Sequence, residues 1–124
     1  MADEIQMTAR LYASKNGASI NPQTWTTAAN MTGTDMGQQT QEVSAGGEVL
    51  DVTADLSLPY KLLIYNMDLT STVGVGDIAS QAGIYWLRIP PQQFILLPWV
   101  NTEIYVKCFT AGSTAKIFAQ YCEI

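Results

Sequence analysis

The residues that usually carry enzyme chemistry are scarce in this chain of 124 residues. It contains no histidine, which removes the commonest general base and metal ligand and every Ser-His or Cys-His arrangement. Without histidine, the two cysteines, Cys108 and Cys122, are too few for a four-ligand zinc site. We therefore expect no enzymatic activity, no catalytic residues, no metal site and no cofactor.

Two further patterns resemble functional motifs but lack their essential neighbours. Asp51 and Asp55 share one face of an alternating stretch, yet no other acids converge on them in the linear sequence. A solvated strand face explains this pair. The glycine pair in Gly74-Val75-Gly76 is not followed by the helix or the Lys-Ser/Thr that phosphate binding requires, so we interpret it as a turn.

Large apolar and aromatic side chains are the remaining candidates for function. Rows of such residues bind sugars by stacking or anchor protein interfaces, and the alternative is ordinary packing between neighbouring strands. The segment around Trp25 is too polar to form a core of its own, which favours a role for Trp25 as an interface anchor. The candidate interface residues are Trp25, Tyr85, Trp86, Phe94, Leu96, Trp99, Tyr105, Phe109 and Phe118.

These residues lie in segments that alternate between apolar and polar positions, the pattern typical of strands. Ile5–Ala13 is predicted to be a strand with one buried face that ends at the turn Lys15-Asn16-Gly17. Val49–Leu56 alternates in the same way. Tyr60–Asn66 and Phe94–Trp99 are instead apolar on both faces, which exceeds the need of a one-sided antiparallel sheet. Either an arm covers these two runs or their outer faces meet another subunit.

The last two predicted strands, Glu103–Thr110 and Thr114–Cys122, form the clearest hairpin, around Gly112-Ser113. Val106, Cys108, Ile117 and Ala119 then share one apolar face with Ile104 and Tyr121, while Tyr105, Phe109 and Phe118 share the opposite face with two lysines. Cys108 and Cys122 fall on opposite faces in this register. We therefore expect buried free thiols and no disulfide.

The number and spacing of the strands predict the fold class. About eight short strands indicate an all-β, single-domain antiparallel β-sandwich of jelly-roll type over residues 1–124. Residues 19–47 are dominated by Thr, Gln, Asn, Gly and Ala, with predicted strands at Thr24–Ala28 and, at an edge, Gln39–Ser44. We interpret residues 19–47 as a polar arm or long loop region that lies over the domain or reaches a neighbour.

The composition indicates which kinds of binding partner the chain has. Only 14% of the residues are charged, whereas 48% are hydrophobic, which favours an exterior that meets other protein. The net charge is −5 and the six basic residues are scattered, so we expect no nucleic acid as a partner. No apolar run is long enough to cross a bilayer, and the start Met1–Glu4 is typical of neither a signal peptide nor a membrane anchor.

The order of segments in the C-terminal two-thirds resembles small virion proteins of tailed bacteriophages. The segments are a strand ending in asparagine at Leu62–Asn66, a Val-x-Val-Gly element at Val73–Gly76, a strand into a proline turn and an apolar run at Leu87–Pro98, and two final strands at Ile104–Lys107 and Ala115–Tyr121.

The proline turn departs from that family pattern. Members of the family usually carry Pro-Gly-Glu there, and this chain has Pro90-Pro91-Gln92-Gln93. The resemblance implies a virion subunit assembled in the host cytoplasm, with itself (a trimer favoured) and a major capsid protein as partners. A capsid decoration or cement protein is the leading hypothesis. The alternative is a tail or host-recognition module that stacks its aromatic residues on surface glycans.

Overall fold

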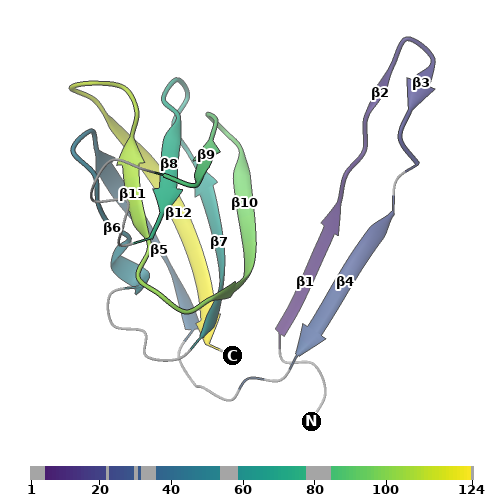
Figure 1. The fold of residues 1–124 in the computed structure, drawn as a ribbon, viewed down its shortest axis with the longest axis horizontal. Coiled ribbons are helices and arrows are strands. Elements are labelled where there is room, and N and C mark those ends of the chain that lie inside the picture. Colours follow the sequence, from purple (N-terminus) through teal and green to yellow (C-terminus); the bar gives the residue numbers. More distant parts are fainter. Residues whose placement is uncertain are drawn as a thin grey trace. The chain divides into compact units, whose positions relative to one another are not determined.

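The chain consists of two compact units, Met1–Thr32 and Gly33–Ile124. The computed structural model describes residues 5–21, 23–29, 31, 36–53, 59–77 and 85–123. The first unit contains a two-stranded ribbon and the second contains two antiparallel sheets (Figure 1). The predicted all-β antiparallel class is therefore confirmed. The described part of the chain includes no helix with the length and hydropathy of a membrane span.

The ribbon is formed by β1 (Ile5–Arg10) and β4 (Thr24–Ala29), which pair antiparallel. Beyond them, β2 (Ser14–Lys15) and β3 (Ala18–Ser19) pair around a two-residue turn. Asn16 and Gly17 occupy this turn with φ angles of 53° and 81°. Two successive positive φ angles define a type I′ turn, whose twist matches that of the flanking strands. The predicted turn at Lys15-Asn16-Gly17 is confirmed.

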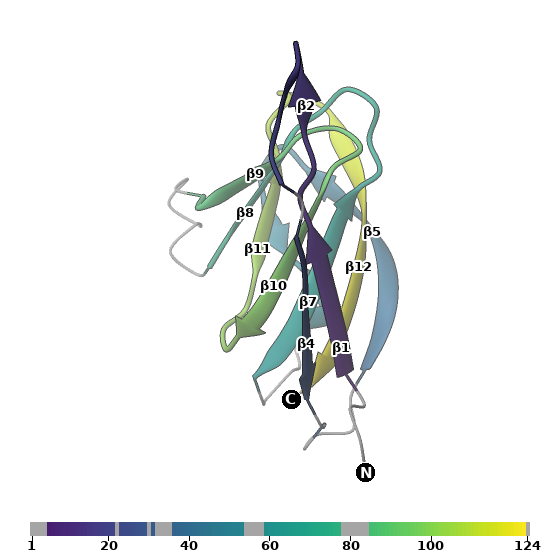
Figure 2. The ribbon, with the colours of Figure 1, turned by 90° about the vertical axis from the view of Figure 1, so that its right-hand side faces the viewer.

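The second unit contains two four-stranded sheets. In spatial order, the large sheet consists of β10 (Phe94–Val100), β7 (Tyr60–Asn66), β12 (Thr114–Glu123) and β5 (Met36–Ser44). The small sheet consists of β6 (Glu48–Val49), β11 (Tyr105–Cys108), β8 (Val73–Gly76) and β9 (Leu87–Ile89). Figure 2 shows β10, β7, β12 and β5 side by side. We call this pair of sheets the sandwich.

The strands of the sandwich pair in a nested order. The first strand, β5, pairs with the last, β12, and the second, β6, pairs with β11. The third, β7, pairs with β10, and the two innermost strands, β8 and β9, pair with each other. Contacts between β7 and β12 and between β8 and β11 then join these four pairs into the two sheets.

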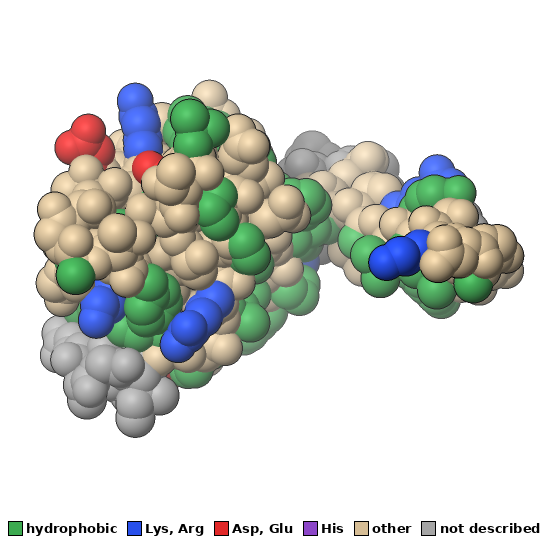
Figure 3. Space-filling model, turned by 90° about the horizontal axis from the view of Figure 1, so that it is seen from above, with side chains coloured by type: hydrophobic (Ala, Val, Ile, Leu, Met, Phe, Trp, Pro, Cys, Tyr) green, Lys and Arg blue, Asp and Glu red, His purple; other side chains and the backbone are tan. Residues whose placement is uncertain are grey.

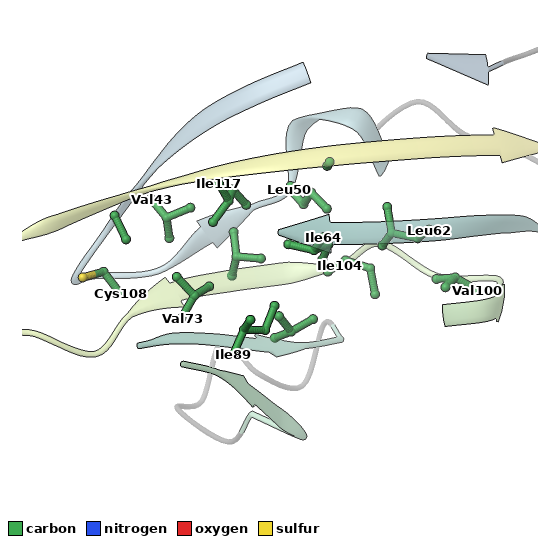
Figure 4. Close-up of a cluster of buried hydrophobic side chains, with 14 of the residues drawn as sticks. Val43, Leu50, Leu62, Ile64, Val73, Ile89, Val100, Ile104, Cys108 and Ile117 are labelled. Atoms are coloured by element: carbon green, nitrogen blue, oxygen red, sulfur yellow. The ribbon is translucent and has the colours of Figure 1, made fainter. Parts of the chain in front are cut away.

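One hydrophobic core lies between the two sheets. Val43, Leu62 and Ile117 enter it from the large sheet, and Val73 and Ile89 enter it from the small sheet (Figure 4). All five side chains are buried, with at most 1% of their surface exposed. Because strand side chains alternate between faces, the inner face of each sheet supplies this core and its outer face is left for solvent or a partner.

The end of β7 is fixed by a buried asparagine. The Nδ2 atom of Asn66 donates to the carbonyl oxygens of Ser71 at 2.8 Å, Ile89 at 3.0 Å and Pro90 at 3.3 Å. Its Oδ1 atom accepts a hydrogen bond from the backbone N–H of Asp68 at 3.0 Å. Asn66 therefore ties the loop after β7 to the segment that connects β9 with β10.

The predicted hairpin between the last two strands is wrong. β11 pairs with β6 and β8, whereas β12 pairs with β5 and β7 in the other sheet. The predicted apolar face is nevertheless buried, since Val106, Cys108, Ile117 and Ala119 are at most 1% exposed. Both strands turn this face toward the same core from opposite sides. The alternation of apolar and polar residues along two strands looks the same whether the strands pair in one sheet or lie in two sheets that face each other.

The polar stretch 19–47 is divided between the two units rather than forming one arm. Its first part belongs to the ribbon, and its last part is β5, which lies at the edge of the large sheet as predicted for Gln39–Ser44. β5 needs few apolar residues because it pairs with β12 along nine positions, from Met36 to Ser44. The boundary between the two units near residue 32 falls inside this stretch.

The strand predicted over Val49–Leu56 is shorter than expected. The strand in this region is β6, and a single turn of 3-10 helix, η1 (Asp51–Thr53), follows it. Asp55 lies outside the described residues. Thr53 lies between Asp51 and Asp55 on the face predicted to be solvated, yet it is buried and its Oγ1 donates to the carbonyl oxygen of Leu50 at 2.8 Å. The same Oγ1 accepts a hydrogen bond from the backbone N–H of Ile104 at 3.1 Å. A satisfied hydroxyl allows this polar residue to lie in the interior.

Candidate functional site

The outer face of the large sheet carries apolar residues on its two central strands. In β7, Leu62 and Ile64 are buried in the core. Leu63 and Tyr65 alternate with them and therefore face outward, where each is half-buried. In β12, Phe118 lies between two core residues and also faces outward.

The strand register aligns these residues into rows across the sheet. Tyr65 pairs with Phe94 of β10 on one side and with Phe118 of β12 on the other. Leu63 pairs in the same way with Leu96 on β10. Directly paired residues project from the same face at about 5 Å. The first row is therefore apolar from β10 to β12, whereas the second is apolar on β10 and β7 and meets a glutamine on β12.

A third row crosses the sheet near the ends of β10 and β12. Cys122 pairs with Lys61 on one side and with Met36 of β5 on the other. A register shift between Leu97 and Val100 marks a bulge in β10, and Lys61 Nζ donates to the carbonyl oxygen of Pro98 within it at 3.1 Å. Trp99 lies in the same bulge and is 61% exposed.

We name the set of outward apolar residues in these three rows the outer apolar face. It comprises Met36, Leu63, Tyr65, Phe94, Leu96, Trp99, Phe118 and Cys122. Phe94 is 61% exposed and Met36 is 67% exposed. Burial raises the pKa of the Cys122 thiol, partly offset by the nearby charge of Lys61. Contiguous apolar patches of this kind on soluble proteins commonly mark sites of protein or ligand binding.

The outer side of the small sheet is closed by its own side chains. The Phe109 ring lies over Gly74, where an added Cβ would come within 2.3 Å of it. The Arg88 guanidinium carbon is 4.5 Å from the ring centroid and Lys107 Nζ is 5.6 Å from it. Tyr85 packs edge-on against the same ring, with centroids 5.8 Å apart. These cation–π and aromatic contacts leave Phe109 packed within the chain.

The candidate residues from the sequence thus fall into separate places. Phe94, Leu96, Trp99 and Phe118 come together on the outer apolar face. The expectation that Phe118 shares a face with Tyr105 and Phe109 is wrong, because β11 and β12 lie in different sheets.

The other candidates are Tyr85, in the Phe109 cluster, and Trp25, Trp86 and Tyr105. Trp25 is 70% exposed on the ribbon and Trp86 is 53% exposed before β9. Tyr105 is only 8% exposed. Cys108 and Cys122 are free thiols as expected, with Cys108 buried and Cys122 partly exposed.

Four members of the outer apolar face were absent from the candidates: Met36, Leu63, Tyr65 and Cys122. The doubly apolar run Tyr60–Asn66 was the signal for Leu63 and Tyr65. Met36 and Cys122 required the register of β5 on β12, which no local pattern contains.

Charge is sparse on the surface. In the space-filling view of Figure 3, hydrophobic side chains and the tan atoms of other side chains and backbone make up most of the coloured surface, and charged side chains cover less of it. Among the described residues, no group of three or more His, Cys, Asp or Glu gathers in a way that could hold a metal ion. The outer apolar face is therefore the candidate site that the geometry defines best, and its chemistry is suited to burial against another apolar surface.

Comparison of the chain with protein-family models, curated proteins and solved structures finds no match.

Proposed function

We propose that this chain is a non-enzymatic structural subunit of a bacteriophage virion, namely a capsid decoration (cement) protein. It stabilises a shell by burying surface against the major capsid protein and against copies of itself, a trimer being favoured. The order of segments in the C-terminal two-thirds, which resembles small phage virion proteins, supports the virion assignment.

One observation carries the proposal: the large sheet carries apolar side chains on its outer face, beside Lys61 and Lys116, as well as on its inner face. Its inner face is used by the core, through residues such as Leu62 and Ile64. Its outer face presents eight apolar side chains that the core does not use. Because the buried centres of protein interfaces are depleted in charge and enriched in aromatic residues, this composition favours a protein partner.

We also infer that the sandwich is a jelly roll. The support is the nested pairing of β5 with β12, β6 with β11, β7 with β10 and β8 with β9. Such an order results when one long hairpin wraps around a core, and jelly rolls are common in capsid and lectin domains. Since one fold serves many functions, the outer apolar face carries the functional argument.

The test uses shells of the major capsid protein encoded with this chain, assembled without the chain. We expect the purified chain to sediment with these shells and to raise the temperature at which they disrupt. Phe94→Ser should weaken both effects. Leu69→Ser is the matched control, because Leu69 is 75% exposed but lies in the loop after β7, outside the outer apolar face. A chain that neither sediments with the shells nor changes their disruption temperature contradicts the proposal.

A second candidate is a glycan-binding module of a phage tail. The observation that favours it is the exposure of two tryptophans, 53% for Trp86 and 61% for Trp99, since exposed indole rings stack on sugars. It predicts weak sugar binding that Trp86→Ala or Trp99→Ala abolishes. A glycan array without any bound sugar excludes this function.

A further inference from the structure

The outer face of the small sheet carries two cationic side chains in one row. Lys107 of β11 pairs with Gly74 of β8, and Gly74 pairs on its other side with Arg88 of β9. Val106 and Cys108 flank Lys107 and are buried in the core, so Lys107 and its row partners face outward. Arg88 is exposed and Lys107 is half-buried. The row therefore holds two positive charges with only a glycine between them.

Two aromatic rings fill the space that glycines leave open on this face. An added Cβ on Gly74 would collide with the Phe109 ring and would lie 3.1 Å from Cγ of Tyr85. An added Cβ on Gly47 would lie 2.6 Å from the Tyr85 hydroxyl oxygen. Tyr85 thus lies across the sheet from one glycine to the other, edge-on to Phe109. Because both rings are half-buried, they form a partly exposed aromatic floor.

The Phe109 ring fixes the position of both charges, since Arg88 Cζ lies 4.5 Å and Lys107 Nζ lies 5.6 Å from its centroid. A guanidinium held over an aromatic ring still has N–H donors at its edge, and it loses little further freedom when it binds a planar anion. We name Tyr85, Arg88, Lys107 and Phe109 the basic aromatic cluster.

The two charges of the cluster lack an acidic partner within the described part of the chain. No ion pair joins Arg88 or Lys107 to an acid there. The acid of the small sheet, Glu48, accepts instead from Gln41 Nε2 at 3.3 Å and from the backbone N–H of Ser44 at 2.8 Å. Because like charges held close together repel each other, an anion bound between the two cations would be stabilised by both.

We propose that the basic aromatic cluster binds a sugar that carries a carboxylate, such as a uronic acid. Arg88 and Lys107 bind the carboxylate, and the sugar ring packs on the aromatic side chains beside them. Trp86 is 53% exposed and lies two residues before Arg88, so their Cα atoms are at most about 7 Å apart. An exposed indole near a guanidinium is suited to a ring that bears a negative charge.

The charge of the whole chain favours a ligand with a single carboxylate. The net charge of −5 repels multiply charged anions such as nucleic acids, whereas one carboxylate is repelled least. An acidic side chain of a protein offers the same carboxylate but no sugar ring for Trp86. The inference rests on the second candidate function, glycan binding, and places its site at Trp86 rather than at Trp99 of the outer apolar face.

The experiment compares two ligands that differ in one group. Methyl glucuronide carries a carboxylate where methyl glucoside carries a hydroxymethyl group. In ligand-observed NMR titrations of the full chain at low salt, the glucuronide should bind at least about tenfold more tightly than the glucoside. Arg88→Gln should weaken glucuronide binding at least about tenfold, because it removes the charge-assisted hydrogen bonds. Arg88 is exposed, so this substitution removes no core side chain.

Lys116→Gln is the matched control, because it removes one positive charge from an exposed position on the large sheet. We expect it to leave glucuronide binding unchanged. Equal binding of glucuronide and glucoside overturns the proposal, and so does an equal loss of binding in Lys116→Gln and Arg88→Gln. Tighter binding of a capped tripeptide with one glutamate also overturns it, since the cluster would then recognise a protein carboxylate.

Two further measurements separate this inference from the proposed functions. A glycan array with only neutral sugars bound leaves the glycan-binding function standing and refutes the acidic class. Sedimentation with capsid shells tests the decoration function by itself. Arg88→Gln should bind shells as the unaltered chain does, because Arg88 lies on the small sheet and the outer apolar face lies on the large sheet. Loss of shell binding in Arg88→Gln assigns the cluster to the capsid contact and overturns the proposal.

Discussion

Replacing Asn66 by alanine tests how the end of β7 is held next to the outer apolar face. Besides its side-chain contacts, Asn66 donates its backbone N–H to the carbonyl oxygen of Gln93 at 2.9 Å and accepts from the backbone N–H of Gln92 at 3.0 Å. These bonds fix the start of β10, where Phe94 pairs with Tyr65. Asn66→Ala keeps the backbone bonds and removes only those of the side chain.

The expected loss follows from the partners that the substitution leaves behind. The carbonyl oxygens of Ser71 and Ile89 lose donors at 2.8 and 3.0 Å, that of Pro90 loses the longer contact at 3.3 Å, and the backbone N–H of Asp68 loses its acceptor. The two amide hydrogens and the one oxygen of the side chain thus account for about three net hydrogen bonds. At about 1 kcal/mol for each net hydrogen bond, the free energy of unfolding should fall by about 3 kcal/mol. For a unit of this size that corresponds to a decrease of about 15 °C in Tm.

Urea unfolding followed by tryptophan fluorescence measures this loss. Asn66→Asp should be at least as destabilising at neutral pH, because a carboxylate cannot donate to the surrounding carbonyl oxygens, and it should recover partly as acid protonates it. Thr70→Ala is the control, since Thr70 is exposed and its hydroxyl donates to Asp68 at the longer distance of 3.3 Å. We expect a change within about 0.5 kcal/mol. A loss below about 1 kcal/mol for Asn66→Ala would refute the role of Asn66 as a buried link.

Three further predictions concern packing and pH. Gly74→Ala should lower the free energy of unfolding by about 1–3 kcal/mol because the added methyl group displaces the Phe109 ring. Gly46→Ala should be nearly neutral in the same urea measurement, because a Cβ added there would meet the Ser44 hydroxyl oxygen at the ordinary contact distance of 3.8 Å. Burial raises the pKa of Tyr60 from 10.0 to about 12. The contribution of Tyr60 to stability is therefore complete below pH 10 and is lost as the pH rises toward 12. Ultraviolet titration of the phenolate with parallel unfolding curves checks this, and Tyr60→Phe should remove this dependence of stability on pH. Backbone N–H groups of the following loop hold the pKa of Asp68 below its ordinary value of 3.8. The contribution of Asp68 to stability is therefore present above that value and is lost as acid titrates the folded carboxylate. Asp68→Asn should lack this acid-dependent loss of stability, and an acid unfolding profile of Asp68→Asn identical to that of the unaltered chain contradicts the prediction.

The sequence predicts strands and faces well, because side-chain alternation is a local property. The turn at Asn16-Gly17 was predicted from its residues, and the buried face of β11 and β12, with Val106 and Ile117, was predicted from period-two alternation. The pairing of those strands was not predictable in the same way. Alternation indicates which side chains face the core. It does not indicate which strands pair, because a strand in the facing sheet turns its apolar side inward just as a neighbouring strand does.

The candidate site was predictable only in part, for a related reason. The runs around Leu63 and Phe94 are apolar on both sides, and this excess indicated an outer surface before any pairing was known. The joining of those residues with Phe118 and Met36 depends on the β12 register with β7 and β5, which is set by residues distant in the sequence. The partition of the polar stretch 19–47 between ribbon and sandwich depends on the same long-range pairing of β5.

The most direct test of the whole interpretation is the mass of the unaltered chain in solution, measured by sedimentation equilibrium over a wide range of concentration. Burial of the outer apolar face against another chain predicts an oligomer that dissociates only on dilution, with a mass that is a multiple of 13.5 kDa. A single species of 13.5 kDa at every concentration contradicts it, because the apolar side chains of Phe94, Trp99 and Met36 would then stay in water with no copy of the chain to cover them.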